Sequence, residues 1–345
     1  MGPPVGDRPR ALALDLDGTL LGTDSLWELF FKGLSQGRLA PLGWLLCGRL
    51  RFKRNLARTV ELDLDLLPWN REVIDLALAH RAGGGEVILA TAANLAMAER
   101  VSARFGFLSG HLASDLEVNL KGAAKARELS GRYGRGGFVY AGDSRADLAV
   151  WREAHGAVVV GPPSLARLAR PLGGEVRTVR PVGSKRPSLG MVLLIGRLAR
   201  WPANLPVLLP LALAHALGAG APGQAPRALL ALLGLCCLSS AGHAMDDLLN
   251  LEADRRDPAR RGGVLASGAL DLSRGGFVFL GFLLAGLAAG LLAGQGLILV
   301  SGLFVLSSLL RSFPRPSRRP PGAAFRALRL ALRLLAGLRA LGPLA

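Results

Sequence analysis

Four short segments of the chain hold polar residues whose types and spacing suit phosphoryl transfer. They contain Asp15, Asp17, Gly18 and Thr19, then Thr91 and Ala92, then Lys121, and finally Asp143 and Asp147. A phosphoryl group carries concentrated negative charge, so clustered carboxylates can approach it only with a cation between. Mg²⁺ suits one or two carboxylates together with phosphate oxygens and water. The segments therefore predict a Mg²⁺-dependent phosphoryl-transfer site.

The two carboxylates best placed to bind the metal are Asp15 and Asp143. A carboxylate beside a metal can also attack phosphorus and form an aspartyl-phosphate. That step needs a second acid/base group for the leaving oxygen and then for water. We expect Asp15 to be the nucleophile and Asp17 to be the acid/base group within the metal shell. Thr91 offers a hydroxyl donor, and Lys121 a positive charge, to the equatorial oxygens.

The remaining polar positions have supporting roles. Gly18 permits the sharp turn after the first strand, and with Thr19 and Ala92 it is expected to line the substrate phosphate. Asp147 is expected to steady either the metal shell or Lys121. Taken singly, Asp-Gly and Gly-Asp are ordinary turn dipeptides that end strands. Four such segments in order favour an assembled site.

Apolar runs precede the polar segments and must position them. Residues 11–14, 87–90 and 137–141 each predict a buried parallel strand, and the polar groups follow where those strands end. In an open α/β sheet the ligand crevice lies outside the carboxyl ends of the strands. Residues distant in the sequence should therefore converge on one point.

At these four segments the chain resembles the haloacid dehalogenase superfamily of aspartate-nucleophile phosphatases. The resemblance covers residues 11 to about 162 and implies a Rossmann-like, doubly wound parallel sheet with Mg²⁺ as cofactor. It implies that residues 22–80 form a mainly helical cap, where such families place substrate selection. The same parts can persist as a scaffold without activity, so a hydrolase and a non-catalytic domain both remain open.

Charge divides the chain into unlike halves. Residues 1–162 hold 20 Lys and Arg against 18 Asp and Glu, whereas residues 163–345 hold 22 against 7. A nucleic-acid surface would interleave basic residues with aromatic or polar groups on a soluble fold. Here the basic residues flank long apolar runs, which excludes nucleic acid as the expected partner.

Four apolar runs predict an all-α transmembrane helix bundle in residues 191–345. They cover residues 205–220, 228–244, 275–294 and 296–310. Two approach the roughly 20 residues that cross a bilayer, and the others come close once interfacial ends are included. The runs are apolar all round and rich in Gly and Ala, which lets membrane helices pack closely. A lipid bilayer is therefore an expected partner.

Arginines predict the orientation of these helices. If the first domain is cytoplasmic, the loop at 250–274 also lies inside with five arginines, whereas only Arg227 is left outside. The N-terminus shows no signal peptide, because Asp15 and Asp17 interrupt its first apolar run. Three cysteines offer no disulfide framework. We expect a multi-pass protein of a bacterial inner membrane with its first domain in the cytoplasm.

Two basic stretches leave alternatives open. Residues 163–190, rich in Pro and Arg, are expected to be a linker that either lies against anionic headgroups or is solvated. Residues 39–50, with arginines after them, either pack within the cap or touch the membrane, and cap packing is the preferred interpretation.

A second candidate site lies where the second apolar run ends. Asp247, Asn250 and Asp254 recur at helical spacing beside Asp246 and Arg255, and acids bordering a membrane are costly unless they serve a purpose. The stretch resembles the first aspartate-rich motif of UbiA-type polyprenyltransferases. The resemblance implies Mg²⁺ carrying a prenyl or polyprenyl phosphate or diphosphate. The alternative is a cytoplasmic loop whose acids balance its arginines.

The chain departs from the UbiA pattern in several places. Asp246 stands where the family has Asn, Asn250 replaces the middle Asp, and no acidic residue follows Asp271, so a second aspartate motif is missing. About four helices stand where the family has about nine. Residues 311–345 hold eight arginines and no acid, which predicts an interfacial amphipathic helix or an altered reading frame.

The combined expectation is a membrane-bound UbiA-like protein with an N-terminal phosphatase domain, acting in polyprenyl lipid or cell-envelope metabolism on a phosphorylated small molecule or lipid phosphate. One alternative is a membrane-anchored phosphatase whose UbiA-like part is inactive. The other is a non-catalytic membrane scaffold. The missing second motif favours the anchored phosphatase over the two-site enzyme.

Overall fold

The chain folds into two units, each described here by itself. The first comprises Met1–Leu34 and Arg38–Ser184, and the second Ser35–Gly37 and Lys185–Ala345. The computed structural model describes residues 11–114, 119–172, 174–183, 186–294, 296–312 and 322–341. Residues 313–321 and 342–345 of the expected Arg-rich tail, and 173 and 184–185 of the expected linker, lie outside the described residues.

A six-stranded parallel sheet forms the centre of the first unit, in the order β3-β2-β1-β4-β5-β6. Its strands are β1 (Ala11–Leu14), β2 (Glu86–Asn94), β3 (Gly110–Ser114), β4 (Phe138–Gly142), β5 (Gly156–Val160) and β6 (Glu175–Val179). The order reverses between β1 and β4, so the ligand crevice of such a sheet is expected outside their carboxyl ends. The predicted doubly wound parallel sheet is confirmed.

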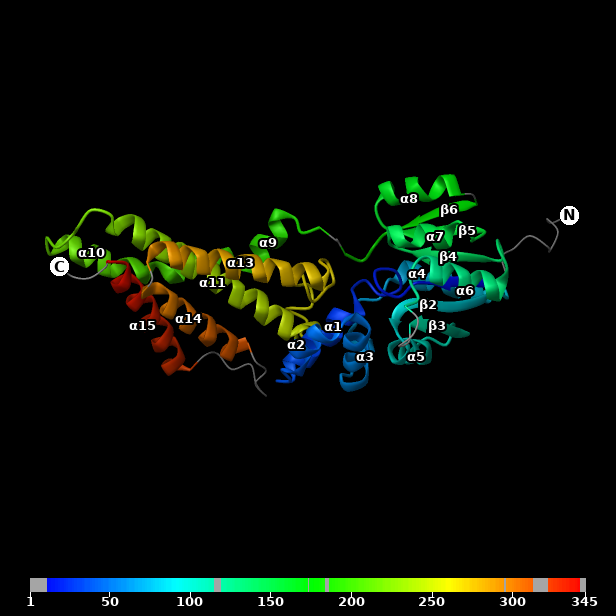
Figure 1. Ribbon diagram of the computed structural model, residues 1–345, viewed down its shortest axis with the longest axis horizontal. Helices are drawn as coiled ribbons and strands as arrows, with labels where there is room; N and C mark the ends of the chain where they lie inside the picture. The colour runs from blue at the N-terminus through cyan, green and yellow to red at the C-terminus, as the bar shows by residue number, and fades with distance from the viewer. Residues whose placement is uncertain are drawn as a thin grey trace. The chain divides into compact units, whose positions relative to one another are not determined.

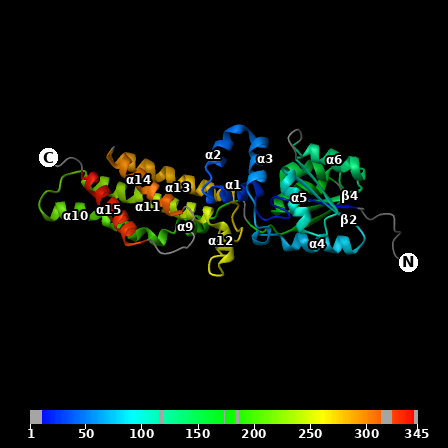
Figure 2. The same ribbon diagram turned by 90° about the horizontal axis from the view of Figure 1, so that it is seen from below.

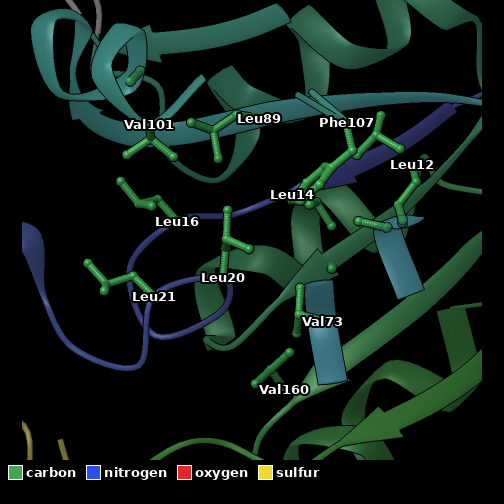
Figure 3. Packing of buried hydrophobic residues seen from close by; sticks show 14 of the residues in the cluster. Leu12, Leu14, Leu16, Leu20, Leu21, Val73, Leu89, Val101, Phe107 and Val160 are labelled. Carbon is green, nitrogen blue, oxygen red and sulfur yellow. The ribbon is translucent and has the colours of Figure 1, made fainter. Parts of the chain in front are cut away.

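Both faces of the sheet are covered by helices, because alternate residues of each strand point to opposite sides. Leu12 and Leu14 of β1 pack in one cluster with Val73 of α4 (Arg71–Ala82) and Val101 of α5 (Leu95–Arg104). Figure 3 shows these side chains meeting between sheet and helices. On the other face, Ala11 and Ala13 pack with α6 (Ala123–Tyr133), α7 (Leu148–Trp151) and α8 (Pro163–Ala169). Figure 2 shows α4 and α6 on opposite faces.

The helical segment between β1 and β2 is shorter than the predicted cap at 22–80. It comprises α1 (Ser25–Ser35), α2 (Ala40–Trp44), η1 (Leu45–Cys47), α3 (Arg49–Thr59) and η2 (Leu64–Leu66). Helix α4, which the prediction included in the cap, packs on the sheet instead. The reason is its spacing, because Val73 and Ala77 lie one turn apart and both are buried against the sheet.

The predicted linker at 163–190 is wrong for its first half. Pro163 opens helix α8, where a proline costs no hydrogen bond, and β6 pairs with β5 over five residues. The first unit therefore extends about twenty residues beyond the predicted boundary at 162.

The second unit is helical. Its elements are α9 (Leu189–Gly196), η5 (Leu198–Leu208), α10 (Leu209–Ala216), α11 (Gln224–Leu249), α12 (Leu251–Arg256), α13 (Leu272–Ala293), α14 (Gly296–Ser312) and α15 (Ala323–Ala340). Helices α11 and α13 lie side by side in Figures 1 and 2. Both are long and apolar enough to cross a membrane.

The other two predicted spans are less regular than the sequence suggested. The run at 205–220 lies in a broken pair, Leu189–Gly196 with Leu198–Ala216, bent by 53°. Pro202 and Pro206 fall inside its second part, which is largely a 3₁₀ helix because proline has no N–H to donate. The run at 296–310 forms a shorter apolar helix. By length and composition the described residues contain two candidate spans, or three if the bent pair is one.

Helix α15 packs as a further member of the helical unit rather than as a tail. It contacts α14, α11 and η5, and a Cβ on its Gly337 would overlap with the Val207 carbonyl. Arg329 lies over the Phe304 ring at 4.0 Å, and the Arg333 Nε donates to Asn204 at 2.9 Å. Arg329 and Arg333 thus pack within the helical unit, whereas Arg326 and Arg339 are exposed. The helix therefore differs in part from the expected interfacial helix.

Candidate active site

The loops that follow β1 and β4 touch at Gly18. Its φ is +77°, and a Cβ there would overlap with the Asp143 carboxylate. Only glycine combines this backbone conformation with so close an approach. The Asp15 N–H donates to the Ala141 carbonyl at 2.9 Å, which ties the start of the first loop to the end of β4. The strand ends therefore place Asp15 and Asp143 together.

Three carboxylates converge at this point. Oxygen atoms of Asp15, Asp143 and Asp147 all lie within 4.8 Å of one another, and they are the one such group of possible metal ligands among the residues that the structure describes. Unscreened carboxylates repel one another, so the arrangement calls for a cation. A hard divalent ion such as Mg²⁺ fits this all-oxygen donor set.

Asp147 already has four hydrogen bonds. Its Oδ2 accepts from the N–H groups of Asp143 and Ser144 and from the Ser144 hydroxyl at 2.7–3.2 Å, and its Oδ1 accepts from the Tyr140 hydroxyl at 2.9 Å. The side chain is buried. Asp147 therefore holds the loop that carries Asp143.

The lysine that meets the nucleophile candidate is Lys125, on the first turns of α6. Its Nζ lies 3.0 Å from Oδ1 of Asp15 and donates to the Tyr140 hydroxyl at 2.7 Å. The Lys125 side chain is only 2% exposed. A fixed ammonium at this point offsets carboxylate charge and can attract an incoming phosphoryl group.

Lys121, which the sequence analysis assigned to this role, has an exposed side chain. It lies before α6, and no contact joins it to Asp15 in the part of the chain that the structure describes. A signal for Lys125 was present in the sequence, since it precedes Leu129 by one helical turn. Both lie on the buried face of α6. A lysine on such a face is rare unless its charge is paired.

Asp17 lies in an environment suited to an acid. Its Oδ1 accepts from the Ser25 N–H at 2.8 Å. Burial and the nearby charge of Asp24 raise the pKa of Asp17 to about 8. Burial also raises the pKa of Asp15, while the Lys125 ammonium acts in the opposite direction. A carboxyl group with a raised pKa holds its proton to higher pH and can donate it to a leaving oxygen.

The remaining predicted residues line the same loops. Thr91 is buried near the end of β2, and its Oγ1 accepts from the Ala93 N–H at 3.0 Å. The Ala92 carbonyl accepts from Lys53 Nζ of α3 at 2.8 Å. The buried Thr19 hydroxyl has no hydrogen-bond partner among the described residues, which leaves it available to a ligand.

Two acids of the second candidate site are paired with arginines. Asp247 forms an ion pair with Arg197, and Asp254 lies 3.6 Å from Arg260. The Asn250 amide donates to the Asp246 carbonyl at 2.8 Å, at the break between α11 and α12. These acids form no three-ligand group within the described ranges. Arg255 donates to the Ala266 carbonyl at 2.9 Å and holds the following loop.

Comparison with known proteins identifies the first unit. The family model described as "haloacid dehalogenase-like hydrolase" matches residues 12–152. The uncharacterized protein y4nM of Sinorhizobium fredii is 32% identical over 311 residues, which cover 89% of this chain and 59% of that protein. The chain thus spans about three fifths of the length of the curated relative it matches.

Solved structures are similar over about half of the chain. A protein of unknown function from Bordetella pertussis Tohama I is 18% identical with a TM-score of 0.39, covering 49% of this chain and 99% of that one. A phosphoserine phosphatase in its apo form is 14% identical with a TM-score of 0.37, covering 50% and 95%. Likenesses this low do not bear on activity. The family match and the four ordered segments together support a haloacid dehalogenase-like hydrolase domain in the N-terminal part of the chain.

Proposed function

We propose that the first unit is a Mg²⁺-dependent phosphatase that uses Asp15 as its nucleophile. The observation that carries the proposal is the convergence of Asp15 with Lys125 and two further carboxylates at the switch point of the sheet. Asp15 and Asp143 would hold the metal, which when bound neutralises charge on the phosphoryl group.

The residues present account for both halves of a phosphatase reaction. A carboxylate oxygen of Asp15 forms a bond to phosphorus while the bond to the leaving oxygen breaks, and Asp17 gives its proton to that oxygen. Asp17, now ionised, takes a proton from water, whose oxygen attacks phosphorus and releases phosphate from Asp15. Lys125 and the Thr91 hydroxyl hold the negative oxygens throughout.

Release of phosphate from a panel of phosphomonoesters by the full chain tests this proposal. Asp15→Asn should lower turnover at least about 1000-fold, because an amide is a poor nucleophile and carries no charge for the metal. Asp75→Asn, a matched change at an exposed aspartate on α4, should leave turnover unchanged. Equal rates for wild type and Asp15→Asn would refute the proposal.

We propose that the second unit anchors this phosphatase in the membrane, with the first unit on the cytoplasmic side of a bacterial inner membrane. The two candidate spans and the arginines between them support this. A phosphorylated small molecule or a lipid phosphate, including a polyprenyl phosphate, is the proposed substrate class.

Prenyl transfer by the second unit is the other candidate function. The acids at the end of α11 favour prenyl transfer. Two of them form ion pairs with Arg197 and Arg260, which should weaken their binding of Mg²⁺. We therefore expect this chain to transfer little or no prenyl group from a labelled prenyl diphosphate. Robust transfer that is lost on Asp247→Ala would favour the two-site enzyme over the anchored phosphatase.

A further inference from the structure

A short projecting segment of the first unit leaves large apolar side chains uncovered. Within residues 38–48, here called the α2 tip, Leu46 is 90% exposed and Leu39 61%, while Leu42 and Leu45 are each 47% exposed. Trp44 is half-buried among them. Single exposed leucines are ordinary, but four within eight residues form a patch that needs a partner.

The rest of the first unit, as far as the structure describes it, does not cover this patch. Positive-φ glycines bound it, at Gly37 and Gly48, and a Cβ built on either of them or on Gly43 would meet no atom within 4 Å. Pro41 is buried and packs against Gly33 of α1. This contact attaches the tip to α1. Packing within the cap was the preferred interpretation for residues 39–50, and for these exposed leucines it is wrong.

The charge around the α2 tip indicates which partner fits. No acidic residue occurs between Glu28 and Glu61. Seven basic residues lie in that interval, of which Lys53 is buried and donates to the Ala92 carbonyl. The other six are Lys32, Arg38, Arg49, Arg51, Arg54 and Arg58. Exposed leucines beside a tryptophan and a surplus of Arg and Lys are the composition of a segment that lies in the interface of an anionic bilayer.

With the second unit anchored in a membrane as proposed above, a short tether limits how far the first unit can lie from the bilayer. The first unit ends with β6 at Val179, and the apolar α9 begins at Leu189. Ten residues reach at most about 35 Å when fully extended. Once the helices of the second unit are inserted, the tip meets the membrane surface at a high effective concentration. A contact between tip and membrane that is weak on its own can then still form in a substantial fraction of the molecules.

We propose that the α2 tip docks on the anionic surface of the bilayer. Leu39, Leu42 and Leu46 enter the boundary between headgroups and acyl chains, and the flanking basic side chains contact the headgroups. This inference rests on the proposed membrane anchor together with exposure, charge and tether length, and it holds whether or not the first unit hydrolyses phosphate esters.

The test measures lipid contact at Cys47, an exposed cysteine at the end of the tip. The full chain, with the buried Cys236 and Cys237 changed to Ala, is reconstituted in phosphatidylcholine vesicles with and without phosphatidylserine. An environment-sensitive fluorophore is attached to Cys47, and quenching by lipids with brominated acyl chains is measured. Control labels go on Leu78→Cys and Leu168→Cys in a Cys47→Ser background, since both leucines are partly exposed on other surfaces of the first unit.

We expect emission from position 47 to move to shorter wavelength in vesicles containing phosphatidylserine. Quenching there should be at least about threefold stronger than at positions 78 and 168. Leu42→Gln with Leu46→Gln should abolish the difference, and phosphatidylcholine alone or high salt should weaken it. These exposed substitutions do not touch the core, and unchanged thermal melting would confirm that the variants fold.

Three results would overturn the inference. Position 47 could be quenched no more than the controls, which would mean that the tip is solvated. Its emission could shift without quenching by brominated lipid, which would mean that protein covers the patch. Equal quenching in both kinds of vesicle would show that anionic lipid is not what the tip recognises.

Discussion

Lys125 Nζ lies 3.0 Å from Oδ1 of Asp15, and a hydroxyl of Tyr140 links the same ammonium to Asp147. The buried Lys125–Tyr140–Asp147 chain thus ties the helix α6 to the loop that carries Asp143. One connected set of side chains fixes the positions of the nucleophile candidate and of a metal ligand candidate.

The first prediction distinguishes the two lysines. Lys125→Met should lower kcat for phosphate release by about 10²- to 10³-fold, because it removes a preorganised positive charge from the reacting oxygens. Lys121→Met should change kcat less than about twofold, since that side chain is exposed. If Lys121→Met were the damaging change, Lys121 and not Lys125 would be the residue that contacts the phosphoryl oxygens, as the sequence predicted.

The second prediction concerns the turn at Gly18. Gly18→Ala adds about 1–2 kcal/mol of backbone strain and drives a methyl group into the Asp143 carboxylate. Gly84→Ala is the matched control, because Gly84 also has a positive φ but a Cβ there meets nothing. Both variants should melt at a lower temperature, and only Gly18→Ala should lose activity. Full activity in Gly18→Ala would show that the two loops need not touch.

The third prediction tests metal binding without an activity readout. Mg²⁺ should raise the melting temperature of the first unit within the full chain, because it relieves repulsion among Asp15, Asp143 and Asp147. Asp143→Asn should reduce this shift and Asp75→Asn should preserve it, both measured by thermal melting over a Mg²⁺ titration. An identical shift in Asp143→Asn would place the ion elsewhere.

The fourth prediction follows from the pKa of Asp17, which burial and Asp24 raise to about 8. The acid form must give a proton to the leaving oxygen, so kcat/KM should fall as pH rises through about 8. Asp24→Asn removes a negative charge that favours the protonated form, and the fall should begin at a lower pH. The profile of Asp75→Asn should match that of wild type. If Asp24→Asn leaves the pH profile unchanged, the loss of activity at high pH does not come from ionisation of Asp17.

Much of the sheet and the site could be predicted because both follow from strand ends. Asp15 and Asp143 come directly after apolar runs, and parallel strands bring such positions together. Lys125 could not be found this way, because its contact depends on how α6 packs on the sheet. The one signal in the sequence is its place one helical turn before Leu129, on the buried face of α6.

The predicted boundary of the first unit at residue 162 was wrong for a related physical reason. Strand β6 lies at the edge of the sheet and most of its side chains are exposed, so it lacks the apolar run that marks β1 or β4. Pro163 suggested a linker, although proline is also favoured in the first turn of a helix. Composition alone therefore could not separate an edge strand from a tether.

The last prediction concerns the orientation of α11. Its two ends must lie on opposite sides if it crosses the bilayer, and the loop after Asn250 carries five arginines against the lone Arg227 near its start. Gly262→Cys and Ala221→Cys report on the two ends, because both positions are exposed. In a background without the native cysteines, an impermeant thiol reagent added outside intact cells should label Ala221→Cys and spare Gly262→Cys until the membrane is opened. Labelling of position 262 alone would invert the topology, and labelling of both from outside would show that α11 does not cross the membrane.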